Sequence, residues 1–179
     1  MTYASAIDKD AITVQLRVME VNYEQVTVDD VNAAVMKWND VRSILNTDTP
    51  LVASCNWSSS GYTGDITIES INITAGLLGI TDFYVYNSGT GVYSAVANPE
   101  SSSASISQIR IALAPLLAKS EKKLITRVIT HEMGHALLLR HPLEYGCSTT
   151  CLMLQTSTDY MSYDIESHDK KCLKNKWRN

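Results

Sequence analysis

The sequence predicts a single α+β domain, and three patterns along the chain support this prediction. Apolar and polar residues alternate over 11–20, which is typical of a strand with one buried face. Apolar residues then recur at helical spacing over 27–42, so a helix there can pack one stripe on a sheet. A second helical pattern follows Ser120, is strongly apolar, and carries two histidines four positions apart. At 179 residues, the chain is long enough to bury the core that such a domain needs.

Short strands are predicted between the two helices, wherever apolar runs are bounded by turn residues. They cover residues 50–55, 65–73, 83–86, 92–96 and 106–113. The turn-rich residues 87–91 predict a hairpin or a surface loop between two of these strands. The apolar spacing changes near Glu69, which predicts a bulge or a change of register there. Thr27 and Ser120 are the expected N-caps of the two helices.

The second helical pattern contains the motif H-E-x-x-H, formed by His131, Glu132 and His135. Residues four apart lie on one face of an α-helix, so the two imidazoles can converge on a single ion. Two imidazoles are half of a zinc site, and a catalytic zinc takes a third protein ligand and keeps one position for water. Glu132 lies beside the first histidine and can reach that water without displacing it. The motif therefore indicates a metal site with a neighbouring carboxylate.

His141 is the expected third ligand, although it lies six residues beyond His135. A continuous helix would turn it about 120° away from the metal-facing side. The helix is therefore expected to end between Leu137 and Arg140, with the chain doubling back. Pro142 fits this prediction, because the residue before a proline is biased out of the helical conformation.

The spacing from His131 to His141 resembles the signature of the metzincin clan of zinc endopeptidases, which is H-E-x-x-H-x-x-G-x-x-H followed by a methionine turn. In that clan the glycine makes the turn with a positive φ angle. This sequence has Leu138 at the glycine position. A leucine in the left-handed region costs roughly 1–2 kcal/mol, so the turn is expected to be strained or built differently.

The resemblance is nearest to compact matrixin-like secreted members, and it implies one metalloprotease catalytic domain over residues 1–179. It implies a twisted, mostly parallel sheet with an antiparallel edge strand, a backing helix and a central zinc-binding helix. Residues 1–140 would form the N-terminal lobe. Residues 141–179 would form a small irregular C-terminal subdomain that contains the methionine turn and ends in a helix. In metzincins the edge strand lines the cleft and pairs with extended substrate, and we expect it within residues 92–111.

Two methionines are candidates for the methionine turn, which in metzincins forms a hydrophobic floor under the zinc. Met153, in the segment C-L-M, is preferred because its distance from His141 is nearer that of short-loop members. Met161, in the segment Y-M-S-Y, resembles the M-S-Y of the serralysin and astacin branches, in which the tyrosine approaches the metal. The corresponding tyrosine here is Tyr163.

The resemblance also implies how the site residues act in zinc-dependent hydrolysis of peptide bonds. His131, His135 and His141 would hold one Zn²⁺, which lowers the pKa of a bound water from 15.7 towards about 7. Glu132 would take the proton of that water as general base and pass it to the departing amine. Tyr163 is a candidate hydrogen-bond donor to the oxygen of the tetrahedral intermediate.

Four cysteines leave two interpretations of the C-terminal region. In an oxidising compartment, one pair among Cys147, Cys151 and Cys172 would form a disulfide that closes the loop after the zinc helix. In a reducing compartment, the same three sulfurs would bind a second, structural zinc with His168 or Cys55 as the fourth ligand. A calcium ion is left open as a further cofactor.

An archaemetzincin-like peptidase is the first alternative function. That branch has cysteines after the third histidine, then C-x-M, then a C-x-x-C pair that builds a second zinc site. Cys147, Cys151 and Cys172 match this pattern in part, because no cysteine follows His141 directly and Cys172 has no partner in a C-x-x-C pair.

A non-catalytic zinc-binding or protein-binding domain is the second alternative. It would result if Leu138 kept His141 from closing the site. The fallback ligands would then be Glu144, Glu166 and His168.

Charge and hydropathy exclude several classes of partner. The net charge of -4 offers no basic patch for nucleic acid, and the basic cluster in residues 170–178 is typical of a solvated helix face. No apolar run reaches the length of a membrane span. Residues 1–6 lack the features of a secretory signal, so the protein is either intracellular (cytoplasmic) or the mature part of an exported one. Abundant Ser, Thr, Asn and Tyr favour a secreted protein, and we expect a monomer that acts on protein or peptide substrates.

Overall fold

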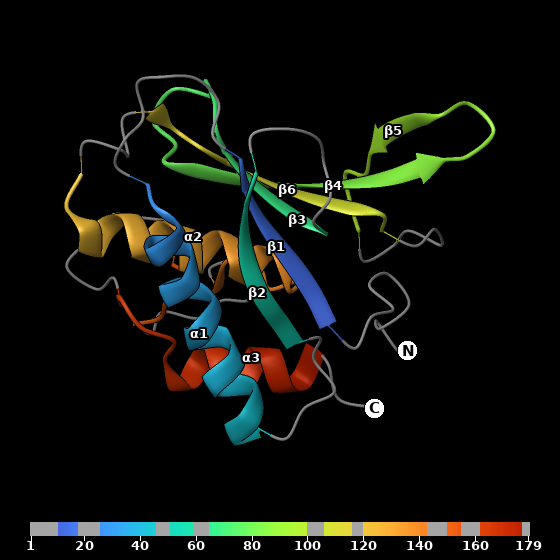
Figure 1. The fold of residues 1–179 in the computed structure, drawn as a ribbon. Coiled ribbons are helices and arrows are strands. Elements are labelled where there is room, and N and C mark those ends of the chain that lie inside the picture. Colours follow the sequence, from blue (N-terminus) through green and yellow to red (C-terminus); the bar gives the residue numbers. More distant parts are fainter. Residues whose placement is uncertain are drawn as a thin grey trace.

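The protein folds into a six-stranded mixed sheet with two helices packed on one of its faces and a third helix beyond them (Figure 1). The computed structural model describes residues 11–17, 26–45, 51–58, 65–99, 106–115, 120–142, 150–154 and 162–176. In chain order the elements are β1 (Ala11–Arg17), α1 (Val28–Leu45), β2 (Leu51–Ser58), β3 (Ile66–Ser70), β4 (Gly79–Asn87), β5 (Val92–Ala95), β6 (Gln108–Leu113), α2 (Lys122–Ala136) and α3 (Ser167–Lys176). The predicted α+β class is therefore confirmed.

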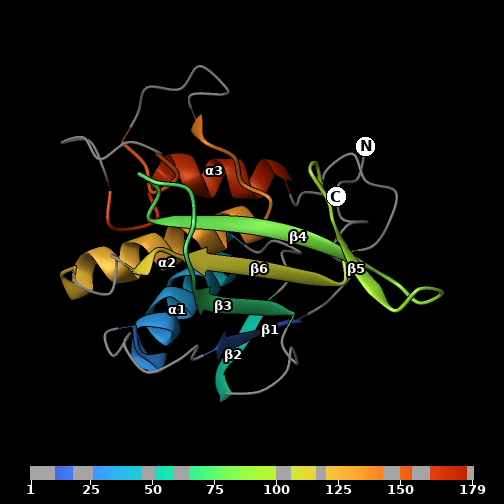
Figure 2. The same ribbon diagram turned by 90° about the horizontal axis from the view of Figure 1, so that it is seen from above.

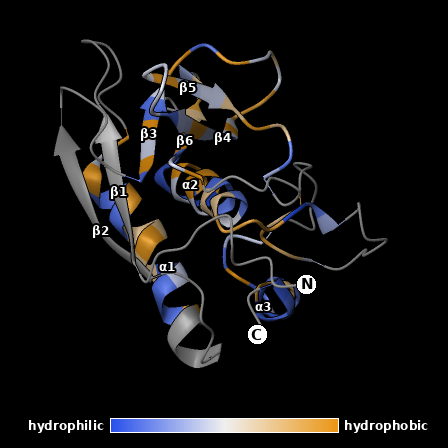
Figure 3. Ribbon diagram, turned by 90° about the vertical axis from the view of Figure 1, so that its right-hand side faces the viewer, coloured by the Kyte–Doolittle hydropathy of each residue, from blue (hydrophilic) through white to orange (hydrophobic). Residues whose placement is uncertain are grey.

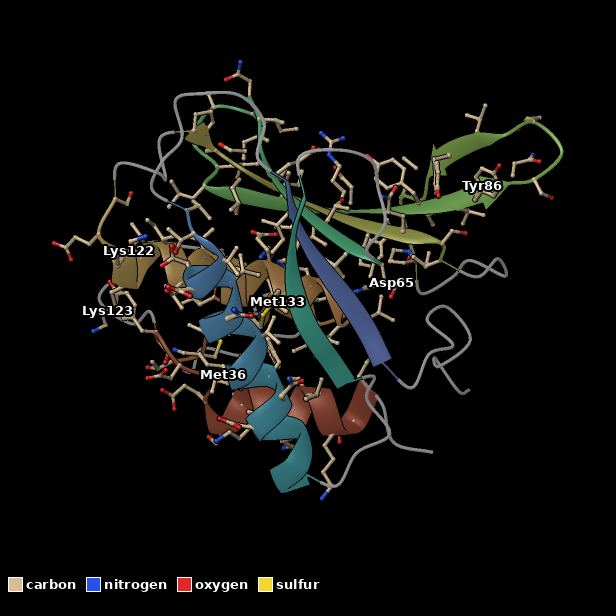
Figure 4. The ribbon with its side chains drawn as sticks, viewed as in Figure 1. Met36, Asp65, Tyr86, Lys122, Lys123 and Met133 are labelled. Atoms are coloured by element: carbon tan, nitrogen blue, oxygen red, sulfur yellow. The ribbon has the colours of Figure 1, made fainter. Side chains whose placement is uncertain are left out.

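The strands are ordered β2-β1-β3-β6-β4-β5 across the sheet, as Figure 2 shows from above. The first four strands in this order are parallel to one another. β4 runs antiparallel to β6, and β5 runs antiparallel to β4. The prediction of a mostly parallel sheet with an antiparallel edge is confirmed, and the antiparallel part is a hairpin of two strands. Tyr86 lies on this hairpin, which extends away from the rest of the protein (Figure 4).

The two faces of the sheet differ because residues paired across neighbouring strands point to the same side. The face towards the helices carries buried isoleucines of β3 and β6, namely Ile66, Ile68, Ile109 and Ile111. The opposite face carries the polar residues that alternate with them, including Thr67, Glu69 and Arg110. Figure 3 shows the apolar residues of α2 gathered in the middle of the molecule, beside the sheet. The core therefore lies between the sheet and α2, where Met133 is fully buried (Figure 4).

Helix α1 begins as the sequence predicts, with Thr27 as its N-cap. The Thr27 backbone N–H donates to Asp30 Oδ2 at 2.8 Å, and the Asp30 N–H donates to Thr27 Oγ1 at 3.4 Å. These reciprocal bonds satisfy amides that have no partner within the helix. Trp38, on the buried side of α1, donates from Nε1 to the Thr130 carbonyl at 2.9 Å. This bond ties α1 to α2 one residue before the first histidine of the motif.

Three local predictions differ from the structure. Ser120 is not the N-cap of α2: Glu121 takes that place, and no side chain caps the helix. The bulge predicted near Glu69 is absent, because β3 ends at Ser70 and the apolar spacing changes where the strand stops. β4 begins at Gly79, four residues before the predicted strand, because pairing with β6 continues from Tyr84 back to Gly79.

Within the described residues, no helix has the length and apolar character needed to cross a bilayer.

Candidate metal centre

Helix α2 carries the first two histidines into the core of the molecule. His131 and Glu132 are only 6% and 5% exposed, and ten residues of this fifteen-residue helix are buried. α2 lies between the sheet and α3, so it has neighbours on most of its circumference (Figures 1 and 3). A helix packed in this way holds its side chains in fixed rotamers, which suits the placement of metal ligands.

The chain reverses directly after α2, as the sequence predicts, and Leu138 makes the reversal. The helix ends at Ala136, and Leu138 adopts a positive φ of 64°. The Leu138 N–H donates to the His135 carbonyl at 2.8 Å, and the Leu139 N–H donates to the Gly134 carbonyl at 3.0 Å. This pair of bonds is a Schellman motif, in which the residue in the left-handed region is normally glycine.

Burial of the Leu138 side chain offsets the strain of this conformation. The residue is 4% exposed and belongs to the hydrophobic core. A left-handed leucine costs about 1–2 kcal/mol, whereas burying its side chain contributes about 1.5–3 kcal/mol. The strained turn that the sequence predicts is therefore formed, and apolar packing keeps it in place.

Replacing Leu138 separates these two effects. We expect the free energy of unfolding to be highest for the wild type, lower for Leu138→Gly and lowest for Leu138→Ala. The alanine variant is last because it loses the packing and keeps the strain. The glycine variant should exceed the alanine variant by about 1 kcal/mol in urea unfolding. Leu137 is a matched control, because its φ is -85° and it is also buried, so alanine there should be at least as stable as glycine. Equal behaviour at both positions would contradict the left-handed turn.

The reversal brings the third histidine to the first two. His141 Nε2 lies 3.3 Å from His131 Nε2 and 3.0 Å from His135 Nε2. Ligand atoms of all three rings lie within 4.8 Å of one another. Three nitrogens around a tetrahedral zinc at about 2.0–2.1 Å are roughly 3.3–3.4 Å apart, so the observed spacing fits such an ion.

Backbone carbonyls fix the protonation of two of the rings. His131 Nδ1 lies 2.8 Å from the Leu152 carbonyl oxygen, and His135 Nδ1 lies 2.7 Å from the Leu139 carbonyl oxygen. A carbonyl can only accept, so each Nδ1 must carry the proton and donate it. Each Nε2 is then left with a lone pair directed at the centre, which is the state that a metal ligand needs.

Burial also keeps these two imidazoles neutral. Desolvation is the main cause that lowers the pKa of His131 to about 3, helped by the neighbouring charge of His135. Desolvation likewise lowers the pKa of His135 to about 4. A neutral imidazole can bind a cation without first releasing a proton, so both rings are ready for a metal at neutral pH.

The same shifts predict how the metal-free protein responds to acid. Each histidine binds its proton in the unfolded chain near pH 6.5 but in the folded protein only near pH 3–4. Stability should therefore fall as the pH drops from 6.5 towards 4, by up to about 1.4 kcal/mol per pH unit for each ring. Glu132 has the opposite effect between pH 7 and 4.5. Its pKa is raised to about 7, so the folded protein binds this proton at a higher pH than the unfolded chain does, and stability gains as the pH falls through that range.

Urea unfolding at several pH values in the presence of a chelator measures this dependence. The variant His131→Gln/His135→Gln should lose stability less steeply than the wild type between pH 6.5 and 4. His168→Gln, which changes a histidine of α3 outside the triad, is the control and should keep the wild-type slope. A slope that does not change in the double variant would contradict the neutral state of the two rings.

Strand β4 holds Glu132 beside the three imidazoles. The Thr81 hydroxyl lies 2.7 Å from Glu132 Oε2 and 3.0 Å from the Glu132 backbone carbonyl oxygen. A Cβ at Gly79 would lie 2.7 Å from Glu132 Cγ, so only glycine leaves room for the carboxylate. Desolvation is the largest cause that raises the pKa of Glu132 to about 7, while the hydrogen bond from Thr81 lowers it. This carboxyl can therefore exchange a proton near neutral pH.

A cleft of about 840 Å³ opens over the three histidines and Glu132. Residues 79–81 of β4 and residues 97–99 are among those that line it. The prediction that the cleft-lining strand lies within residues 92–111 is wrong, since β5 pairs with the far half of β4 and β6 lies inside the sheet. Tyr163 also lines the cleft, as the sequence suggests, with Lys123 Nζ 4.2 Å from the centre of its ring.

Met153 packs beneath the helix turn that carries the histidines. A Cβ at Gly134 would overlap Met153 Sδ and would approach Trp38 to 3.0 Å, so these groups are in close contact. Met153 is buried, in a turn whose Leu152 carbonyl accepts from His131. The other candidate for the methionine turn, Met161, lies outside the described residues.

The cysteines are only partly described. Cys151 is a buried thiol and Cys172 a half-buried one, so these two do not form a disulfide. Ligand atoms of Cys151, His168 and Asp169 lie within 4.8 Å of one another. Cys172 Sγ lies 3.8 Å from the His168 ring nitrogens. The side chains of Cys55 and Cys147, and the fallback ligand Glu144, lie outside the described part of the chain.

Three residues near the site were not predicted from the sequence. Thr81 had no signal, because a threonine in a strand is ordinary. Arg127 had one, because it is a charge on an apolar helix, four residues before His131 and eight before His135, and so lies on the ligand face. Asp169 had none, because two of its partners, the Leu152 and Met153 amides, lie in another segment. Glu166, one of the fallback ligands, accepts instead from the Ser162 hydroxyl at 2.7 Å.

Comparison with known proteins finds likeness in structure but no matching family model. No protein-family model matches the sequence, and no curated protein matches it. Among solved structures, the chain is similar to the crystal structure of archaemetzincin from Methanopyrus kandleri. The TM-score is 0.49 and the sequence identity 11%, and the likeness covers 95% of this chain and 97% of that one. The function is therefore inferred from the residues of the site.

Proposed function

We propose that the protein is a zinc-dependent endopeptidase. The observation that carries this proposal is the convergence of three imidazole nitrogens beside a buried carboxyl group, at the base of a cleft bordered by a strand. His131, His135 and His141 would hold the zinc, and Glu132 would be the general base. The matrixin-like, secreted character of the protein stays a prediction of the sequence.

The donor set fits a catalytic zinc. His131, His135 and His141 would hold the zinc from the wall of the cleft and would leave space on the cleft side for water, the arrangement that distinguishes catalytic from structural sites. When bound, zinc would activate water as a nucleophile and polarise the carbonyl of the scissile bond. The non-catalytic alternative required Leu138 to keep His141 from the other rings, whereas His141 lies within 3.3 Å of both.

Glu132 supplies the proton transfers. A general base works best when its pKa lies near the working pH, and the pKa of Glu132 is raised to about 7. The carboxylate would accept the proton of the attacking water and give it to the departing amine. Thr81 holds Oε2 on one side, which leaves Oε1 and the remaining lone pairs for this transfer. Gly79 allows the carboxylate to lie against β4 without a clash.

The free edge of β4 indicates an extended peptide as the substrate. β6 pairs with one edge of β4 over residues 79–84, while β5 covers the other edge only over residues 84–87. Among the described strands, none pairs with the second edge of residues 79–82, and residues 79–81 line the cleft. An extended peptide can bind there through main-chain hydrogen bonds, with its scissile bond beside Glu132.

Removal of the general base tests the proposed function. Glu132→Ala should keep bound zinc while its kcat/KM on casein or a peptide library falls about 10²–10⁴-fold, the usual contribution of general acid–base catalysis. Glu121→Ala changes a glutamate at the start of the same helix and should keep wild-type activity. A chelator should abolish hydrolysis in the wild type, and added zinc should restore it. Full activity of Glu132→Ala would refute the assigned role.

An archaemetzincin-like peptidase with a second, structural zinc is the alternative that a specific observation favours. Cys151, Cys172 and His168 come together beside the turn that holds Met153. Burial raises the pKa of the Cys151 thiol to about 12, so a metal there would have to displace its proton. Asp169, although nearby, already accepts hydrogen bonds from three backbone amides and is the weakest candidate ligand.

Metal analysis distinguishes the two forms of the proposal. The alternative predicts two zinc ions per chain and loss of one in Cys151→Ser, with His131→Gln losing the other. A single catalytic zinc predicts one ion per chain, unchanged in Cys151→Ser and lost in His131→Gln. Inductively coupled plasma spectrometry of the purified protein, combined with a count of reactive thiols, gives the answer.

A further inference from the structure

Two buried side chains of opposite charge lie on either side of the turn behind His131, and the proposed chemistry uses neither. Arg127, on α2, is 6% exposed, and Asp169, on α3, is 0% exposed. Removing a charge from water is costly unless it is hydrogen-bonded in its new place. Both residues meet this condition by bonding to the backbone of the same segment, which is residues 152–154.

Arg127 binds the carbonyl groups of this segment. Its Nη2 donates to the Leu154 carbonyl at 3.1 Å and lies 3.4 Å from the Leu152 carbonyl oxygen. Its Nε donates to the Ser162 carbonyl at 3.1 Å. Arg127 lies one helical turn before His131, so the guanidinium and the imidazole project from one face of α2 towards the same backbone.

Asp169 binds the amides of the same segment from the other side. Its Oδ2 accepts from the Leu152 N–H at 2.9 Å and from the Glu166 N–H at 2.9 Å. Its Oδ1 accepts from the Met153 N–H at 3.2 Å. Three amide dipoles therefore partly offset the cost of burying this carboxylate, although desolvation still raises its pKa. Asp169 also lies in the first turn of α3, where the helix dipole favours a negative charge.

The Leu152 residue joins these contacts to the metal centre. Its N–H is held by Asp169, and its carbonyl oxygen receives both Arg127 Nη2 and His131 Nδ1. The carbonyl is the group that fixes the tautomer and the ring orientation of His131. Its own direction is set by two charged side chains that lie 25 residues before it and 17 residues after it.

We propose that Arg127 and Asp169 are positioning residues that fix the Leu152 carbonyl, and through it His131, and thereby set the metal affinity of the centre. This inference rests on the zinc site of the proposed function but not on hydrolysis. Groups that orient a metal-ligating histidine usually contribute 10- to 100-fold to metal affinity. The effect belongs to His131, because His135 is oriented by Leu139 within the helix end itself.

Zinc affinity of the full chain, measured by competition with a chromophoric chelator, tests the proposal. Asp169→Asn keeps the shape of the side chain but replaces one acceptor with a donor, and Arg127→Met keeps most of the volume but removes the donors. Each variant should raise the Kd for zinc about 10- to 100-fold. Variants whose Kd stays within twofold of the wild type would overturn the proposal.

Matched controls carry the same chemical changes elsewhere. Asp164→Asn alters an exposed carboxylate that pairs with Lys37 and lies five residues before Asp169. Lys122→Met removes a charge from the first turn of α2, where Lys122 pairs with Asp30. Both controls should bind zinc within twofold of the wild type. A similar loss of affinity in the controls would mean that net charge, and not the Leu152 carbonyl, sets the Kd, which would also overturn the proposal.

A second measurement distinguishes positioning from a purely structural role and needs no variant. Coupling between sites is reciprocal, so zinc bound to His131 must tighten the contacts that hold Leu152. Hydrogen exchange of the wild type should show the Leu152 and Met153 amides slowed by zinc about tenfold more than the Gly91 amide, which bonds to the Asn87 carbonyl in the turn of the hairpin and does not line the cleft. Uniform slowing would indicate general stabilisation alone and would refute the proposal, even if the Asp169 variant failed to fold.

The outcomes for the proposed function and for this inference can be told apart. A protein that binds zinc and hydrolyses no peptide would refute the endopeptidase and leave the positioning role to be decided by the Kd values. An active enzyme whose zinc affinity ignores Arg127 and Asp169 would refute the positioning role alone. A wild type that binds no zinc would refute both.

Discussion

The reversal of the chain at Leu138 is the constraint on which the site depends. Without it, His141 would continue along the helix and point away from His131 and His135. The left-handed φ of a leucine is unfavourable by itself, so the turn exists because the core receives the leucine side chain. Leu138 therefore has two roles: its backbone makes the turn that brings the three histidines together, and its side chain forms part of the hydrophobic core.

Burial then prepares two kinds of group for opposite tasks. Removal from water lowers the pKa values of His131 and His135 and raises that of Glu132. In both cases the neutral form is favoured, because the protein interior solvates charge poorly. The histidines thus keep lone pairs that could bind a cation, while the carboxyl has a pKa close to the pH at which the proposed reaction would need it to accept and release a proton. Different contacts tune the result, with Thr81 opposing the shift of Glu132.

The sequence predicted the parts of the site that local geometry determines. Helical spacing places His131 and His135 together, and the need for a turn follows from His141, so these residues and Glu132 could be assigned from a short stretch. The strands and α1 followed from periodicity, although β4 was predicted too short because its pairing with β6 is non-local. Thr81 reaches Glu132 across 51 residues of sequence, and no periodic pattern signals such a contact.

Gly134 shows how closely the helix and the segment behind it fit. Any side chain at this position would meet the thioether of Met153 and the indole ring of Trp38, so the three residues share one small volume. A larger side chain at one of them can be accommodated only if another becomes smaller. During divergence of this protein, positions 38, 134 and 153 are therefore expected to covary, even though none of them would bind the metal.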